Sequence, residues 1–328
     1  MASGSALPAR PVRGSASERQ VTTASTTDSA ITARAVAFVA AHKPEAERLG
    51  ASLSEHTSDP DAFSRALAAG FAQLADPEYL EGEHRVAPGL GPTYGVRWPL
   101  SAAVDRGFRQ ATRGERPSGY LELADRLFAE RELELRWFAF GLLERLLPAD
   151  PERAWQLLRR AAREAADWIT VDSLAHPYGR GIILEGYRWA ELEQLVYSSS
   201  EWERRLVGST VATLPFIDRT RGREQQVAVH GLGLIGDLIG DAEPNVQKAL
   251  AWALRSLVLV DPDAVLAFVE RETARAAQTD DGHRAWVLRD VLDKLPPART
   301  AEIKASLRPI RRRAGAPSTS ETRSAMPV

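Results

Sequence analysis

The dipeptide Asp-Pro occurs four times in a chain of 328 residues, at 59–60, 76–77, 150–151 and 261–262. Each copy is followed by a run whose apolar residues recur at the spacing of an α-helix. Aspartate is a favoured helix N-cap, and proline suits the first helical turn because no N–H is needed there. The dipeptide therefore predicts four helix starts spread along the chain, and it limits the fold to one built largely from helices.

The rest of the chain has the same helical pattern. Apolar residues recur at i, i+3, i+4 and i+7 in ADPERAWQLLRRAARE, VDPDAVLAFVERETARAA and LELRWFAFGLLERLL, whereas period-two alternation is nearly absent. Ser200 and Glu203 match a capping box that begins another helix, with Trp202 in its first turn. The glycines and prolines of 80–96 predict a long loop before a helix near Pro99. We expect an all-α fold.

Consecutive helices with short connections favour antiparallel pairs stacked as a solenoid. Internal sequence similarity is weak, but the alternation of helices and short connections has a period near 40 residues. This is about the size of a HEAT unit. Such a stack curves, and its concave side can hold an elongated ligand. A helical bundle is the alternative.

Composition sets the domain boundaries and excludes several classes of protein. We expect a disordered tail at 1–28, where large apolar residues are scarce, a folded domain at 29–307, and a disordered basic tail at 308–328. The first tail lacks the hydrophobic core of a signal peptide, although a transit peptide is an alternative. The basic cluster RPIRRR is either a phosphate-binding segment or solvated charge, and we favour the second.

The absence of cysteine rules out disulfides, thiol nucleophiles and cysteine metal sites, and it fits a reducing cytosol. Six scattered histidines offer no metal-ligand cluster. No apolar run approaches the roughly 18 to 20 residues that span a bilayer. The net charge of -2 argues against a globally basic nucleic-acid binder but leaves a local basic face possible. We expect a cytoplasmic monomer with no cofactor, no metal and no membrane partner.

Two helical stripes combine an indole with charged groups. Trp168 and Asp172 lie four residues apart, so they share one helix face and can contact a single bound group. Lys248, Trp252 and Arg255 lie at i, i+4 and i+7, so two cations flank an indole. The opposite stripe of that helix is apolar, and we assign its residues to the core: Val246, Leu250, Ala253 and Leu257.

A third helix offers Trp202 with Arg205 at i, i+3, and there we assign the indole to packing. An indole on a helix is more often a core residue than a ligand, and we assign the remaining tryptophans to packing: Trp98, Trp137, Trp155, Trp189 and Trp286. His176 and Tyr178 follow Asp172 closely, and either a site role or a loop contact explains them. The arginines of 219–223 either contact phosphate or border a loop.

Three segments, in this order and spacing, carry a family resemblance: DWITVDSLA (167–175), SEWERRLV (200–207) and NVQKALAWALRSLVLVDPDAVLAFVE (245–270). They resemble the AlkD-type alkylpurine DNA glycosylases, which are HEAT-like solenoids that excise cationic alkylated purines. The resemblance covers roughly 95–294. The chain departs from the family pattern at Asp167, where members often carry an aromatic residue, and at Ile169, where they often carry an acid.

The resemblance implies a role for each matching residue. Asp172 becomes the catalytic carboxylate, Trp168 and Trp252 hold the sugar and phosphate of the damaged nucleotide, and Arg205 contacts the DNA backbone. We assign Lys248 and Arg255, the cations of the Trp252 stripe, to DNA binding as well. The implied partner is double-stranded DNA that contains alkylated purines, recognised without base flipping.

The chemistry agrees with these roles. An N3- or N7-alkylated purine is positively charged and leaves readily, and a carboxylate stabilises the oxocarbenium-like sugar that forms. No lysine stands beside Asp172 in sequence as a Schiff-base nucleophile, so we expect a monofunctional hydrolase. A non-catalytic DNA-binding protein and a HEAT interaction scaffold are the rival functions.

Overall fold

The computed structural model describes residues 16–322, and within this range the chain forms fifteen α-helices and no strand. The predicted all-α class is confirmed. The helices are α1 (Ala16–Ser52), α2 (Pro60–Gln73), α3 (Pro77–Val86), α4 (Trp98–Ala111), α5 (Tyr120–Phe128), α6 (Leu133–Leu146), α7 (Pro151–Glu164), α8 (Trp168–Leu184), α9 (Trp189–Leu195), α10 (Glu201–Ile217), α11 (Gln225–Leu238), α12 (Pro244–Leu257), α13 (Pro262–Thr279), α14 (Gly282–Val291) and α15 (Pro297–Leu307).

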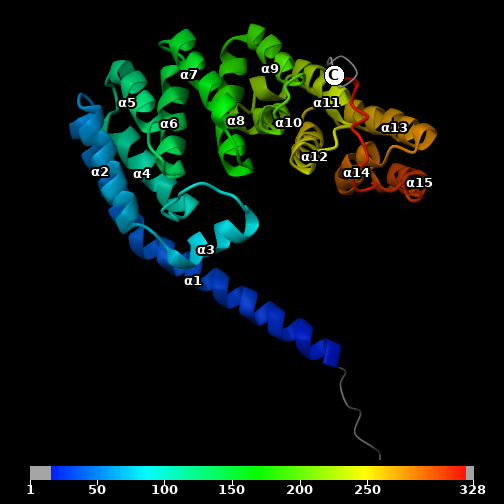
Figure 1. The fold of residues 1–328 in the computed structure, drawn as a ribbon, viewed down its shortest axis with the longest axis horizontal. Helices are drawn as coiled ribbons and strands as arrows, with labels where there is room; N and C mark the ends of the chain where they lie inside the picture. Colours follow the sequence, from blue (N-terminus) through cyan, green and yellow to red (C-terminus); the bar gives the residue numbers. More distant parts are fainter. Residues whose placement is uncertain (1–15, 323–328) are drawn as a thin grey trace, which may run out of the picture.

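The helices follow an arc in two rows, as expected for a helical-repeat solenoid (Figure 1). The outer row contains α5, α7, α9, α11 and α13, and the inner row contains α4, α6, α8, α10, α12 and α14. Neighbouring inner helices pack on one another from α4 to α14. The long helix α1 packs along α4, and its N-terminal half extends away from the arc. One nearly continuous apolar core runs from Ala46 to Ile310.

All four Asp-Pro pairs begin helices, as predicted. Asp59, Asp76, Asp150 and Asp261 are the N-caps of α2, α3, α7 and α13, and each carboxylate accepts a hydrogen bond from a backbone N–H in the first turn. The next residue in each case is the proline that starts the helix. The short side chain of aspartate satisfies donors that the helix itself leaves unpaired.

Two local predictions are wrong in part. Residues 80–86, expected in a loop, belong to α3, and only the part from Ala87 to Arg97 is irregular. The Asp76 cap and Pro77 start a helix that a single internal glycine does not stop. Ser200 is the N-cap of α10, but its hydroxyl makes no capping bond; Glu203 instead accepts a hydrogen bond from the hydroxyl of Ser198.

Both segments for which we expect a disordered tail lie partly within the described residues. Helix α1 begins at Ala16, inside the segment for which we expect disorder. Residues 308–322 pack on the domain because Ile310 is buried and the N–H of Thr319 donates to the carbonyl of Gly240 at 2.8 Å. Residues 1–15 and 323–328, which belong to the same two predictions, lie outside the described part.

Close helix packing in the inner row depends on glycine. A Cβ atom on Gly208 of α10 would lie 2.8 Å from the backbone carbonyl carbon of Ala249 in α12 and 2.9 Å from the amide nitrogen of Leu250. These are backbone atoms, so a side chain at 208 would push α10 and α12 apart. The two helices carry Arg205 and Trp252, so their spacing also sets the spacing of the site described below.

We expect Gly208→Ala to lower the free energy of unfolding by about 1–3 kcal/mol, the usual cost of overpacking. Gly233→Ala in α11 is the matched control because a Cβ atom added at Gly233 would meet nothing within 4 Å. There the same substitution should stabilise the helix by about 0.5–1 kcal/mol. Urea unfolding of both variants measures the difference, and equal effects at the two positions would contradict the proposed close packing.

Candidate functional site

The start of α8 fixes one face of the site. The carboxylate of Asp167 accepts hydrogen bonds from the backbone N–H of Thr170 at 2.7 Å and from its hydroxyl at 2.6 Å. The same hydroxyl accepts a hydrogen bond from the indole N–H of Trp137 at 2.8 Å. Asp167, which departs from the family pattern, is thus the N-cap that makes Trp168 the first helical residue. Asp172 follows one turn later on the same face.

Asp172 is held by two side chains of α10. The guanidinium of Arg205 donates to both carboxylate oxygens, with Nε 3.1 Å from Oδ1 and Nη2 2.8 Å from Oδ2. The hydroxyl of Ser209 donates to Oδ1 at 2.6 Å. Charge-assisted hydrogen bonds are strong, and together the two donor side chains fix the orientation of the carboxylate. Sequence analysis missed Ser209, which lies one turn beyond Arg205 and so faces α8 with it.

Arg205 has a different environment from the one that the resemblance implies. The residue is 5% exposed, and its remaining described hydrogen bond goes from Nη1 to the carbonyl of Asn245 at 2.7 Å. Its guanidinium carbon also lies 5.9 Å from the centre of the Trp168 ring. A buried guanidinium engaged in this way is poorly placed for an exposed DNA phosphate. The geometry favours a positioning role for Arg205, with Asp172 as its partner.

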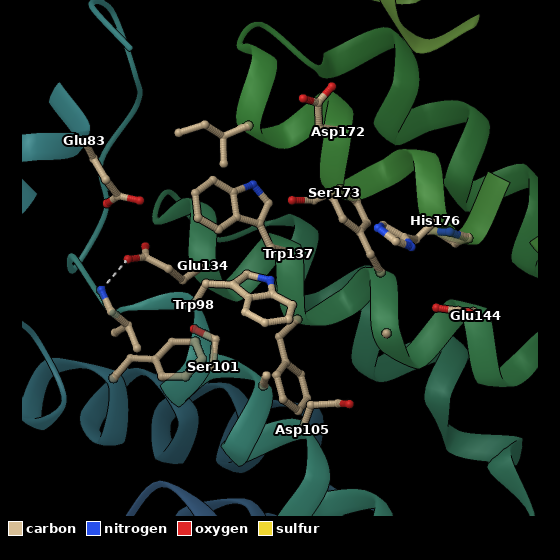
Figure 2. A pocket seen from close by; sticks show the side chains of 18 of the residues that line it. Glu83, Trp98, Ser101, Asp105, Glu134, Trp137, Glu144, Asp172, Ser173 and His176 are labelled. Atoms are coloured by element: carbon tan, nitrogen blue, oxygen red, sulfur yellow. Dashed lines mark hydrogen bonds between the residues drawn. The ribbon is translucent and has the colours of Figure 1, made fainter. Parts of the chain in front are cut away.

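Trp168, Asp172 and Trp252 line one cavity of about 520 Å³. Trp98 and Trp137 also line it, and Figure 2 shows their rings between Glu83 and Glu134 on one side and Asp172, Ser173 and His176 on the other. The sequence assigns Trp98 and Trp137 to core packing, and for Trp98 this is wrong because it is 74% exposed. The signal was its place at the start of α4, directly after a loop, where an indole has little core to join.

The three cations assigned to DNA binding occupy different environments. Lys248 is exposed and has no ion pair among the described residues, so a phosphate contact stays a prediction for it. Arg255 pairs with Asp290 of α14, and burial lowers the pKa of its guanidinium. The apolar stripe of α12 is confirmed as core, since all four of its residues are fully buried: Val246, Leu250, Ala253 and Leu257.

The cavity wall is rich in carboxylates as well as aromatic rings. Glu134 is buried and accepts N–H bonds from Tyr94, Gly95 and Val96 at 2.8–3.2 Å, which anchors the loop before α4. Glu83 is also buried, and burial with the nearby charge of Glu134 raises its pKa to about 7. The cavity wall therefore gains negative charge as the pH rises through about 7 and Glu83 ionises.

Glu83 should make stability depend on pH. Its folded pKa of about 7 lies above the ordinary value of 4.5, so the folded state holds a proton that the unfolded chain releases between these values. Stability then falls as pH rises from about 4.5 to 7. We expect Glu83→Gln to raise the Tm at pH 8 by about 2–4 °C, which corresponds to roughly 1 kcal/mol in a domain of this size, and to change it less at pH 5.

Glu81→Gln is the control because Glu81 lies on the same helix and, within the described part of the chain, pairs only with the exposed Arg85. Thermal melts at pH 5 and pH 8 provide the measurement. A Glu83→Gln variant whose Tm shift is the same at both pH values would show that this carboxyl does not titrate in the folded protein.

The remaining sequence candidates have structural roles or stay open. Trp155 and Trp189 are buried in the core, as predicted, and Trp202 and Trp286 are partly buried against it. Tyr178 is buried and packs against Trp155 with ring centres 4.5 Å apart, whereas His176 is among the residues that line the cavity. Among the arginines of 219–223, the Nε of Arg223 donates to the carbonyl of Pro215.

Two further findings concern the described residues alone. Between residues 16 and 322, no group of three or more histidine, aspartate or glutamate side chains is arranged to hold a metal ion. No helix in that range combines the length and apolar character required to cross a membrane.

The chain matches a known protein family. None of the curated proteins compared with the chain matches it. The family model described as "DNA alkylation repair enzyme" matches residues 67–291, which is more than half of the chain. The matched segment contains Trp168, Asp172, Arg205 and Trp252, the residues that the structure gathers around one cavity wall. The chain therefore belongs to the DNA alkylation repair enzyme family.

Proposed function

We propose that the protein is a monofunctional DNA glycosylase that removes cationic N3- or N7-alkylated purines from duplex DNA by hydrolysis. The observation that carries the proposal is the carboxylate of Asp172, which is fixed by Arg205 and Ser209 at the wall of a cavity lined by tryptophans. Because the chain belongs to a family of DNA alkylation repair enzymes, we infer that this carboxylate acts on damaged DNA.

The reaction is a hydrolysis at the sugar C1′ atom. The bond between C1′ and the ring nitrogen breaks, its electron pair neutralises the charge of the alkylated purine, and an oxocarbenium-like sugar remains. Water adds to C1′ and loses a proton. Because the leaving group is already cationic, no general acid is required, and the main demand on the protein is negative charge near the sugar.

The environment of Asp172 suits this demand. Its two donors hold the carboxylate in one orientation before substrate arrives, so little reorganisation is needed as positive charge develops. Trp168 and Trp252 supply electron-rich ring faces in the same cavity, and such faces attract cations. Their bulk would exclude water from around the carboxylate, which strengthens its interaction with the forming cation. Asp172 thus acts through charge, and the indoles act through positioning.

The size and composition of the cavity bear on the substrate range. The volume of about 520 Å³ is far larger than a methyl group requires, so the cavity has room for a bulky adduct. Its wall combines apolar rings with the carboxylates of Glu83 and Glu134, which suits a large cationic adduct. We propose that bulky N3 or N7 adducts are substrates and that the nucleotide is recognised from its backbone side without base flipping.

A lyase step is not part of the proposal. No lysine or cysteine is among the residues that line the cavity in the described part of the chain. A covalent Schiff base with the sugar therefore lacks a nucleophile at this place. The product should be an intact abasic site together with the free alkylated base.

The decisive experiment is incubation of the full chain with duplex DNA that contains 7-methylguanine, 3-methyladenine or a bulky N3-adenine adduct. Release of the free base, detected by mass spectrometry, and an abasic site that breaks only after alkali are the expected results. Salt-dependent binding without base release from any of the three duplexes would instead indicate a non-catalytic DNA-binding protein. Absence of both would favour an interaction scaffold.

A further inference from the structure

A second cavity lies at the C-terminal end of the arc, away from Asp172. It has a volume of about 570 Å³ between the C-terminal ends of α14 and α15, and we call it the C-terminal groove. Its lining residues are Arg289, Leu292, Lys304, Ala305, Arg308 and Arg311. Four of these six side chains are cations, and none of the six is an acid.

The charges of the C-terminal groove are poorly neutralised. Arg289 donates to the carbonyls of Leu307 and Ile310, and Arg311 donates to the carbonyl of Arg308 at 2.6 Å. Carbonyl acceptors satisfy these donors but carry no compensating charge. Burial and the nearby charge of Arg311 lower the pKa of the Arg289 guanidinium, as expected where like charges are crowded.

Two of the four cations, Arg308 and Lys304, are exposed and have almost no partner among the described residues. Arg308 is exposed, and its guanidinium has no hydrogen bond or ion pair among the described residues. Lys304 has one carboxylate nearby, that of Asp293 at 3.8 Å, and both side chains are largely exposed. Exposed ion pairs at such a distance contribute little. Of the acids on α14 and α15, Asp290 pairs with Arg255 of α12, and Glu302 is not among the residues that line the groove.

The C-terminal groove lies between α14 and α15, at the end of the inner row of helices that carries the site. On α12, Arg255 follows Trp252 by one turn and pairs with Asp290 of α14, the residue after Arg289. Figure 1 shows α14 and α15 at the end of the arc, on the side of α12. The family match ends at residue 291, so Lys304, Arg308 and Arg311 are features of this chain outside the matched segment.

We propose that the C-terminal groove binds phosphodiester groups of the DNA backbone, beyond the nucleotide that is being repaired. The proposal rests on the proposed function, because DNA alkylation repair supplies the duplex that spans the inner face. Arginine and lysine side chains are suited to phosphate oxygens, and they release condensed counterions from the duplex when they bind. Arg289 and Arg311 cap carbonyl groups, so Arg308 and Lys304 supply the direct contacts.

The test removes these two contacts while leaving the capping arginines in place. In Lys304→Ala/Arg308→Ala neither lost side chain makes a described hydrogen bond, so the fold should persist, and a thermal melt verifies this. Arg65→Ala/Arg159→Ala is the control, with the same loss of charge from exposed positions on α2 and the outer helix α7. Affinity for an undamaged duplex is measured by fluorescence anisotropy across a salt series.

We expect the groove variant to lose about tenfold in affinity near 0.1 M salt and to reduce the salt slope by about 1–2 units, roughly 0.9 for each lost phosphate contact. The control should change neither quantity. Damaged and undamaged duplexes should be affected equally. An unaltered slope and affinity would overturn the proposal.

Inorganic phosphate distinguishes a DNA site from a site for a free anion. Phosphate that raises the Tm of the original protein but not of the groove variant, together with unchanged DNA affinity, would identify a free-phosphate site and overturn the DNA proposal. The binding assay uses undamaged DNA, so its outcome is independent of base release. Failure of the glycosylase proposal would appear separately, as absent base release by the original protein.

Discussion

Asp172→Asn should lower the single-turnover rate of base excision by about a hundredfold or more while changing DNA affinity by less than about threefold. The carboxylate opposes positive charge that exists only as the glycosidic bond breaks, so its loss affects the transition state more than the bound ground state. Asparagine keeps the shape and can still accept one hydrogen bond from Arg205. The measurement uses a duplex with a single 7-methylguanine and saturating enzyme.

Asp172→Asn should also destabilise the protein, because it breaks the ion pair between Asp172 and Arg205. Arg205 is 5% exposed, and Asp172 is the carboxylate that it contacts, so Asp172→Asn leaves a buried cation without a counter-charge. Such a change commonly costs about 3–5 kcal/mol, whereas replacing both partners with uncharged groups is often close to neutral. The double variant Asp172→Asn/Arg205→Met should therefore recover most of the lost Tm.

The excision rates of the single and double variants distinguish loss of the catalytic charge from loss of stability. If Asp172 stabilises the developing sugar cation, the stable double variant should remain as slow as the single one. Recovery of excision along with the Tm would show that the single variant failed for structural reasons, and Asp172 would lose its catalytic assignment. Arg205→Met alone should slow excision less than Asp172→Asn, because the carboxylate remains but is held by Ser209 only.

Local helix signals were sufficient to predict the fold class. The four Asp-Pro pairs define helix starts through contacts within one turn, so no tertiary information was needed. The loop predicted at 80–96 was wrong in part because glycine weakens a helix by only about 1 kcal/mol, and the cap at Asp76 outweighs it. The packing of residues 308–322 could not be predicted, since it depends on contacts with Gly240, 79 residues away from Thr319.

The candidate site was predictable where its residues lie on one helix face. Trp168 and Asp172 share a face through their spacing alone, and the apolar stripe of α12 identified the core side opposite Trp252. The pairing of Asp172 with Arg205 joins α8 to α10 across 33 residues and has no local signature. The same holds for Trp98, whose place in the cavity depends on how α4 packs beside α6, which in turn packs on α8.

Trp168→Ala and Trp252→Ala should each slow excision by about 10- to 100-fold, although neither indole supplies an acid or a base. Both line the cavity that contains Asp172, and both are only partly buried. Their loss would loosen the position of the sugar and admit water around the carboxylate, and small errors of position in a site can cost about a hundredfold in rate. Single-turnover rates on the 7-methylguanine duplex measure the effect.

Trp155→Ala is the matched control, since Trp155 is 2% exposed and lies in the core away from the cavity lining. Removing a core tryptophan commonly costs about 3–5 kcal/mol, so this variant should show the largest fall in Tm and, at a temperature where it remains folded, nearly normal excision. The two cavity variants should show the reverse: modest loss of Tm and large loss of rate. If instead their Tm falls as far as that of Trp155→Ala while excision by the folded fraction is normal, the indoles are packing residues, and Asp172 must act without them.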